Sequence, residues 1–205
     1  MTQSEKADQV YRSVSRTIKH LEETKGSPET KALLANLRHG AGKSPAQLPD
    51  VWGTVLEGLS FIDENSRKIS PEENAVYLTM TLYALGCQGQ DSKSQKIQQP
   101  GVSLGQAVGL LVRKDPQKLR NMQIRMKSLL NSRDYTQMGV KLRTLISMIC
   151  KDGGLDFPLL AKDLYWMGFP NSRNMTGISW ARAFVRTVTL PESDEEKKGE
   201  DHEKE

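Results

Sequence analysis

The sequence predicts an all-α protein with about eight to nine helices, arranged as two small helical bundles. Apolar residues recur every three or four positions through most of the chain, which is the spacing of an amphipathic helix. Several of these segments begin with a Ser or Asp that can cap a helix. No segment alternates apolar and polar residues over a useful length, so strands are not expected.

A polar stretch over residues 89–101, GQDSKSQKIQQPG, is a linker or loop candidate and the best boundary between two helical halves. It separates an N-terminal bundle (1–88) from a basic C-terminal bundle (102–190). Residues 191–205 contain no apolar side chain and are expected to form a disordered acidic tail. The 205 residues suffice for a substantial core, as one domain or as two small ones.

In the N-terminal half, Ser27-Pro28 pairs an N-cap with proline at the first helical position, and Ser70 and Glu73 form a capping box. Four helical segments are expected there: residues 5–24, 29–38, 51–59 and 74–87. In the C-terminal half, Ser103, Asp115 and Asp156 are helix-starting residues. The helical segments expected there are residues 104–114, two successive helices within 116–151, 157–167 and 178–188.

The two helices within residues 116–151 are the most informative part of the chain, because Asp134 is their only acid before the last turn. Surface helices usually mix acids with bases, since oppositely charged pairs four residues apart support the helix. A polyanionic partner is the simplest reason to omit them, although Lys and Arg can also form a solvated face that covers apolar edges. The bases are Lys118, Arg120, Arg125, Lys127, Arg133, Lys141, Arg143 and Lys151.

Each of these two helices has one apolar face, with bases at its margins. The apolar residues of the first are Leu119, Met122, Met126, Leu129 and Leu130, and those of the second are Met138, Leu142, Leu145, Ile146 and Ile149. Both helices therefore present a face to a core and a basic rim to a partner or to water.

The formal net charge of +4 conceals a strong asymmetry along the chain. Residues 1–100 hold 12 bases and 12 acids, whereas residues 101–190 hold 14 bases and 5 acids, and residues 191–205 hold 3 bases and 8 acids. The positive field therefore belongs to the C-terminal half, which favours a phosphate-rich partner. The acidic tail has the opposite charge and could shield that half.

Enzyme chemistry finds little support in the sequence, and we expect no catalytic residue, no metal and no cofactor. Gly40-Ala41-Gly42-Lys43-Ser44 resembles the end of a phosphate-binding loop, but Leu37 stands where the first glycine belongs and Pro45 follows. The three histidines lack ligand spacing. Cys87 and Cys150 fit small core residues in a reducing compartment. Without a signal peptide or membrane span, the protein is expected to be cytoplasmic.

Three tryptophans, Trp52, Trp166 and Trp180, lie in apolar helical patterns. Core packing is the interpretation we favour, and stacking on nucleic-acid bases is the alternative.

Several segments together resemble the CasB-like small subunit of type I-E CRISPR Cascade complexes. They are ALLANLRHGAGKSPAQLPDVW (32–52), NAVYLTMTLYALGCQ (74–88), SLGQAVGLL (103–111), the basic helix pair, LDFPLLAKDLYWM (155–167) and SWARAFV (179–185). They follow the order of that family over about residues 30–187. The chain departs from the family pattern at His39, where a second arginine is usual, and at Gly86, where a histidine is frequent.

The resemblance implies an all-helical, non-enzymatic subunit that works without sequence preference, because base pairing with the CRISPR RNA reads the sequence. It implies as partners the CRISPR RNA, the target DNA with its displaced single strand, the Cascade backbone and large subunits, and a second copy of this chain. The implied role is to hold the guide–target duplex and the displaced strand, so that the R-loop persists. No membrane is involved.

We predict phosphate contacts at ten basic residues. Arg38 could equally hold the following loop through backbone carbonyls. An alternative for the whole protein is a helical scaffold whose basic face docks on an acidic protein surface. The ten residues are Arg120, Arg125, Lys127, Arg133, Lys141 and Arg143, with Arg38 and Lys43 as a second cluster and Arg182 and Arg186 as outliers.

Overall fold

The computed structural model describes residues 1–59, 66–89 and 97–189. Within these ranges the all-α prediction is confirmed, since the regular structure consists of nine α-helices, three 3₁₀ turns and one isolated parallel bridge between Gln98 and Leu155. The helices are α1 (Gln3–Glu23), α2 (Pro28–Arg38), α3 (Trp52–Leu56), α4 (Pro71–Gly86), α5 (Leu104–Lys114), α6 (Leu119–Leu130), α7 (Tyr135–Asp152), α8 (Phe157–Met167) and α9 (Pro170–Thr189).

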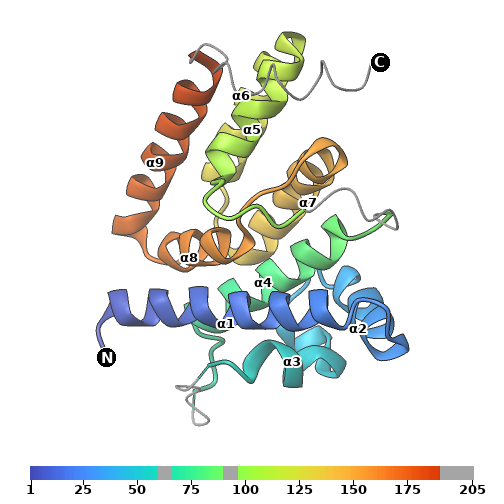
Figure 1. The fold of residues 1–205 in the computed structure, drawn as a ribbon. Helices are drawn as coiled ribbons and strands as arrows, with labels where there is room; N and C mark the ends of the chain where they lie inside the picture. The colour runs from blue at the N-terminus through green and yellow to red at the C-terminus, as the bar shows by residue number, and fades with distance from the viewer. Residues whose placement is uncertain (60–65, 90–96, 190–205) are drawn as a thin grey trace, which may run out of the picture.

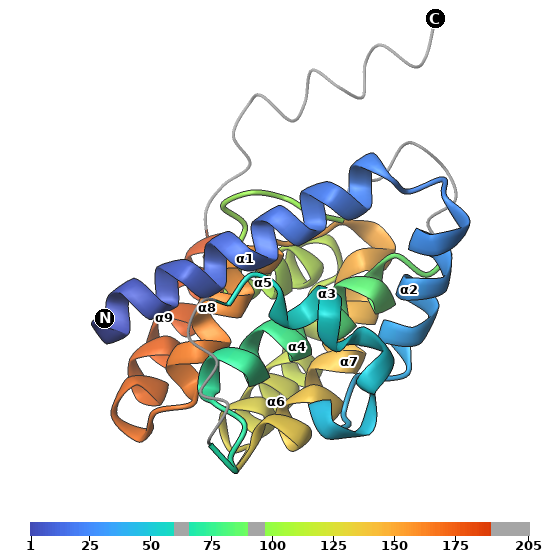
Figure 2. The ribbon, with the colours of Figure 1, turned by 90° about the horizontal axis from the view of Figure 1, so that it is seen from below.

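Helix α4 lies in the centre of the molecule, where it contacts α1, α2, α3, α7 and α8 (Figure 2). Its sequence is apolar around the whole helix, as expected for a helix buried on all sides, and 13 of its 16 residues are buried. The buried Thr81 hydroxyl donates a hydrogen bond to the Leu78 carbonyl at 2.7 Å, so its polar atom has a partner inside the core.

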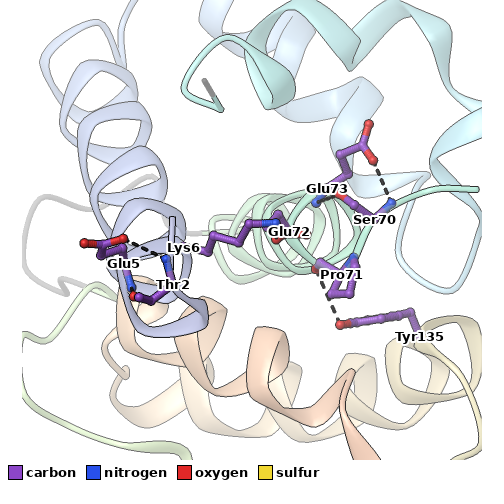
Figure 3. Close-up of polar contacts among 8 residues, drawn as sticks. All are labelled: Thr2, Glu5, Lys6, Ser70, Pro71, Glu72, Glu73 and Tyr135. Atoms are coloured by element: carbon purple, nitrogen blue, oxygen red, sulfur yellow. Dashed lines mark hydrogen bonds and ion pairs between the residues drawn. The ribbon is translucent and has the colours of Figure 1, made fainter. Parts of the chain in front are cut away.

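The N-terminus of α4 is held from three sides (Figure 3). The predicted capping box is confirmed, with the Ser70 N–H donating to Glu73 at 2.7 Å and the Glu73 N–H donating to the Ser70 hydroxyl at 3.2 Å. Glu72 pairs with Lys6 of α1 at 2.9 Å. The Tyr135 hydroxyl of α7 lies 3.1 Å from the Leu164 carbonyl of α8 and 3.4 Å from the carbonyl of the first α4 residue, and it can donate its proton to either. These contacts fix α1 and α7 against the same end of α4.

Helices α5 and α9 pack closely through two glycines of α5 (Figure 1). A Cβ at Gly105 would lie only 2.1 Å from the Trp180 carbonyl oxygen, and a Cβ at Gly109 would lie 2.7 Å from Thr187. Glycine is required at both positions because the two backbones approach each other there. Helix α8 connects this pair to the rest of the molecule by packing against α1, α4 and α9.

Three local expectations were wrong. The last helix begins at Pro170, eight residues or about two turns before the expected start, and Arg173 holds the first of these turns by donating to the carbonyls of Met167 (3.0 Å) and Ser132 (2.6 Å). Trp52 is 42% exposed, because α3 is too short to bury it. Leu119 is 38% exposed, because a 3₁₀ turn over residues 116–118 places it at the start of α6, away from the core.

The expected disordered tail (191–205) and most of the expected linker lie outside the described residues. The division into bundles over 1–88 and 102–190 stays a prediction. In the described part of the chain, no helix combines the length and the apolar character that crossing a membrane requires.

Candidate nucleic-acid interface

The basic segment folds as the predicted pair of helices, α6 and α7, which pack against each other. Asp134 caps α7 by accepting a hydrogen bond from the Gln137 N–H at 2.8 Å. All five residues predicted to face inward from α7 are buried. In α6, Met122 and Leu129 are buried, and Met126 and Leu130 are half-buried against the same core. Apart from Leu119, the predicted inner faces are therefore confirmed.

All ten predicted basic residues are exposed or half-buried. Ion pairs occur elsewhere in the molecule, at Lys6–Glu72, Lys19–Glu23, Lys118–Asp115 and Lys162–Asp8. In the described ranges, by contrast, no carboxylate lies within ion-pairing distance of any of the ten. These positive charges are therefore available to an anionic partner, and they repel one another until one binds.

Hydrogen bonds already engage two of the bases on the helix pair. The Lys141 ammonium donates to the Ser128 carbonyl at 2.7 Å, so it caps the C-terminal end of α6 and ties the two helices together. Arg125 lies on the same stripe of α6 as Ser128, and its Nε donates to Asn121 at 2.7 Å. Arg133 lies in the turn between the helices, where its side chain is exposed. Lys141 thus has a structural role that the sequence did not indicate.

The structure brings the loop that carries Lys43 directly against α7. Gly42 has a φ of +88°, and a Cβ there would lie 2.9 Å from the Val140 side chain, while a Cβ at Gly139 would lie 2.9 Å from the Gly42 nitrogen. Arg143 lies one turn after Gly139 on the same side of α7. Lys43 and Arg143, which are 100 residues apart, therefore belong to neighbouring parts of one surface.

Arg38 lies in the last turn of α2, just before this loop. Within the described residues it makes no hydrogen bond to the carbonyls of the loop, which was the structural alternative considered for it. The glycines of the GAGKS motif serve packing, since a Cβ at Gly40 would lie 2.7 Å from Leu48, Thr81 and Tyr77.

On its other side, α6 forms a groove with α9. The groove has a volume of about 390 Å³ and is lined by Met126, Lys127 and Leu130 of α6 and by Ala181, Phe184 and Val185 of α9, among others. Arg120 lies two turns before Lys127 on the same stripe of α6, and Arg182 and Arg186 directly follow two lining residues. Lys127 and Arg120 therefore lie along the α6 side of the groove, whereas Arg182 and Arg186, turned about 100° from the lining residues, lie on the exposed face of α9.

The structure does not gather the ten residues into one cluster. Arg38 is on α2 and Arg182 and Arg186 are on α9, and these helices lie on opposite sides of the molecule (Figures 1 and 2). Helices α6 and α7 lie between them. An extended polyanion could contact bases on all four of these helices, whereas a small anion could contact only a few of them.

Two exposed apolar residues next to these bases were not anticipated as surface features. Ile124 of α6 is 60% exposed and Val140 of α7 is 58% exposed. The only signal in the sequence was that each interrupts a polar helical face.

The remaining reactive groups have structural surroundings. Burial raises the pKa of the Cys87 thiol to about 11 and that of the Cys150 thiol to about 12, so both are protonated at neutral pH and poorly nucleophilic. No group of three or more His, Cys, Asp or Glu side chains that could hold a metal occurs in the described ranges.

Trp180 is buried and donates from Nε1 to Asp163 at 2.6 Å, and Trp166 is half-buried beside Tyr165. Core packing is thus confirmed for Trp180, and Trp166 is packed against the core.

Comparison with known proteins identifies the family. The sequence profile of the CRISPR-associated protein Cse2 matches residues 33–184, which is more than half of the chain. The chain belongs to the Cse2 family. The resemblance to CasB-like small subunits of type I-E Cascade is thereby confirmed.

Solved structures of Cse2 and CasB proteins share this fold. CasB from Thermobifida fusca is 26% identical with a TM-score of 0.72, over 86% of this chain and 97% of that one. A Cse2-family protein from Thermus thermophilus is 24% identical with a TM-score of 0.62, over 84% and 97% of the two chains. CasB from M. ruber is 22% identical with a TM-score of 0.60, over 92% and 98%. No curated protein matches the chain.

Proposed function

We propose that this Cse2-family protein is a non-catalytic subunit of a CRISPR RNA-guided surveillance complex. In this role the basic surface of α6, α7 and the Lys43 loop binds nucleic-acid backbone without sequence preference. It stabilises the guide–target duplex and the displaced strand of the R-loop. The partners we propose are the CRISPR RNA, the target DNA, the other Cascade subunits and a second copy of this chain, in the cytoplasm.

The observation that carries the proposal is the row of exposed bases on α6 and α7 without acidic partners in the described ranges. Backbone phosphates are a repeated negative charge, and a row of bases matches them without reading any base edge. Formation of an R-loop exchanges one duplex for another of similar stability, so a few such contacts shift the balance.

A salt series of single-stranded DNA binding by the purified protein tests this proposal. Neutralisation of about four phosphates with a slope of about −0.7 each predicts a roughly 50-fold loss of affinity between about 50 and 200 mM salt. A variant with R120E, R125E and R143E should bind weakly and show a flatter salt dependence, after circular dichroism has confirmed its fold.

A matched control reverses three exposed bases of α1, with R12E, R16E and K19E. The net charge changes by the same amount, but α1 lies on the opposite side of the molecule from α6 (Figures 1 and 2). Retained binding in this control would assign the effect to the α6–α7 surface. Equal losses in both variants, or no DNA binding at low salt, would contradict the proposal.

The second candidate function is a scaffold whose basic face docks on an acidic protein surface. The exposed Ile124 and Val140 favour it, because apolar side chains add to a protein interface more than to a phosphate-binding surface. In that case I124S and V140S would weaken assembly with Cascade subunits while leaving single-stranded DNA binding unchanged.

A further inference from the structure

The groove between α6 and α9 has an apolar floor. Met126 and Leu130 of α6 and Ala181 and Phe184 of α9 line it, and its volume is about 390 Å³. The lining residues span positions 123–131 on the α6 side and 177–185 on the α9 side, which is roughly 12 Å, or just over two helical turns. A third helix that lies along such a groove places side chains at i, i+3 or i+4, and i+7 into it.

Exposed apolar surface is concentrated on the same two helices. Of the nine large apolar side chains that are exposed in the described ranges, five belong to α6 or α9. Val185, which is 55% exposed, lines the groove itself, and Ile178 lies two turns earlier on the same side of α9. A concentration of exposed apolar side chains marks an interaction site. The five are Leu119, Ile124, Met175, Ile178 and Val185.

Only positive charge borders this floor on the α6 side. Arg120 and Lys127 lie one turn before and one turn after Ile124, along the edge of the groove. Both bases are exposed, and within the described ranges neither has an ion pair. Neither α6 nor α9 contains an Asp or a Glu. A matching occupant therefore combines an apolar surface with negative charge beside it.

Three other occupants match this surface less well. A nucleic-acid backbone would pair with the bases but leave the apolar floor without a partner. A symmetric contact between two copies of the chain would place this acid-free surface against itself, so that bases face bases. Residues 191–205 carry acids but contain no Leu, Ile, Val, Met or Phe that could fill the floor.

We propose that the α6–α9 groove binds an acidic amphipathic helix of a partner protein. The apolar stripe of that helix fills the floor, and its carboxylates pair with Arg120 and Lys127. This inference does not rest on the proposed nucleic-acid binding, and it adds a protein site to that function instead of replacing it. Arg125, on the opposite edge of α6, and Arg143 of α7 remain available to phosphates.

A pair of synthetic helical peptides tests the chemistry of the site. The acidic peptide has about 15 residues, with leucines at i, i+3, i+4 and i+7, glutamates beside this stripe and alanines on the outer face. The second peptide has lysine in place of every glutamate. In fluorescence anisotropy with the full-length protein at low salt, the acidic peptide should bind at least about tenfold more tightly, since each exposed ion pair contributes a factor of up to about five.

Charge reversal at the groove should invert this preference. R120E and K127E together should favour the lysine peptide, whereas the control R12E and R16E changes the net charge equally on α1 and should keep the preference for the acidic peptide. Equal binding of both peptides to the wild type, or a preference that the control also inverts, would overturn the proposal.

A substitution in the floor separates this site from the DNA-binding surface. Ala181 is exposed, so A181Q lays a polar side chain across the floor without disturbing the core, and it should weaken acidic-peptide binding about tenfold. A32Q makes the same change at an exposed position of α2 and should have no effect. Single-stranded DNA affinity should be unchanged in both variants. Unchanged peptide binding in A181Q, or an equal loss of DNA affinity, would overturn the proposal.

Photo-crosslinking identifies the occupant in the assembled Cascade complex. With p-benzoylphenylalanine in place of Ile178, at the edge of the groove, we expect a link to an acidic amphipathic helix of another protein. Links only to nucleic acid, to a second copy of this chain or to residues 190–205 would overturn the proposal, as would the absence of any link. If the protein fails to bind DNA, the proposed function fails, whereas the peptide and crosslinking results still decide the occupant of the groove.

Discussion

The contact between α1 and α4 and the surface of α6 and α7 use charge in opposite ways. At the first, Glu72 is 3% exposed and Lys6 neutralises it at 2.9 Å. At the second, the bases are exposed or half-buried and, within the described part of the chain, have no acidic partner. A buried carboxylate requires a partner for the fold to persist, whereas exposed bases without partners cost some helix stability and leave charge for a ligand. The comparison assigns a stabilising role to the charges of the first region and shows that those of the second region do not serve as ion-pair partners within the described part of the fold.

The largest expected loss of stability comes from breaking the buried pair. K6A leaves the Glu72 carboxylate buried without its ammonium and should lower the free energy of unfolding by about 2 kcal/mol, less than for a fully buried pair because Lys6 is partly exposed. Urea denaturation measures this change. K19A is the control, because its pair with Glu23 is exposed and 3.9 Å long, and it should cost less than about 0.5 kcal/mol.

Charge reversal on the α6–α7 surface should, by contrast, leave the stability of the fold unchanged. R120E, R125E and R143E should leave the unfolding free energy within about 0.5 kcal/mol of the wild type, since substitutions at exposed positions rarely cost more. A loss as large as that of K6A would show that these bases stabilise the fold and would remove the distinction between the two regions.

A half-buried carboxylate, Asp163, sharpens the comparison because its hydrogen-bond partner is a tryptophan N–H rather than a base. Burial raises the pKa of Asp163 to about 6, against an ordinary value near 4. The folded protein therefore keeps the Asp163 proton up to about pH 6, whereas the unfolded chain loses it near pH 4. As a result, the free energy of unfolding falls as the pH rises from about 4 to about 6.

D163N removes this titration while keeping an oxygen that can accept from Trp180. The stability of the variant relative to wild type should therefore rise between pH 4 and pH 7.5, by about 3 kcal/mol at most for a shift of about two pKa units. Urea denaturation of both proteins at the two pH values measures the difference, in which other titrations cancel. A difference independent of pH would show that Asp163 titrates normally.

A further comparison distinguishes two lysines within the proposed binding surface. K141M removes the hydrogen bond to the Ser128 carbonyl and should cost about 1 kcal/mol of stability. Lys127 lies at the groove and makes no hydrogen bond in the described ranges. K127M should therefore reduce DNA affinity at low salt and leave the free energy of unfolding unchanged. If the two variants behaved alike, the structural role of Lys141 would be wrong.

The helices were predictable where their signals are local. Ser70, Ser103 and Asp156 cap α4, α5 and α8 as expected, because a cap is formed by residues three positions apart. The start of α9 was not predictable, because its first turn is held by Arg173 reaching the carbonyl of Ser132, 41 residues away. The exposure of Trp52 was also not predictable. The apolar spacing over residues 51–59 indicates a helix, but it does not show that the helix ends at Leu56.

The accessible positions of the bases were predictable residue by residue, but the way the bases are arranged relative to one another was not. Spacing alone placed the bases of α6 and α7 at helix margins. Their grouping depends on contacts between distant segments, such as the packing of Gly177 against Leu130 that forms the groove. The capping role of Lys141 likewise depends on the way the helix pair folds back on itself.

The contact between Gly42 and Gly139 also has a consequence for the timing of assembly in the cell. Gly42 is synthesised 97 residues before Gly139, the α7 residue that it contacts. At roughly 5–20 residues per second, translation leaves an interval of about 5–20 seconds between the two. A ribosome-bound chain therefore carries Lys43 well before it carries the helix that positions it. Nascent chains consequently lack this part of the basic surface until synthesis has passed α7.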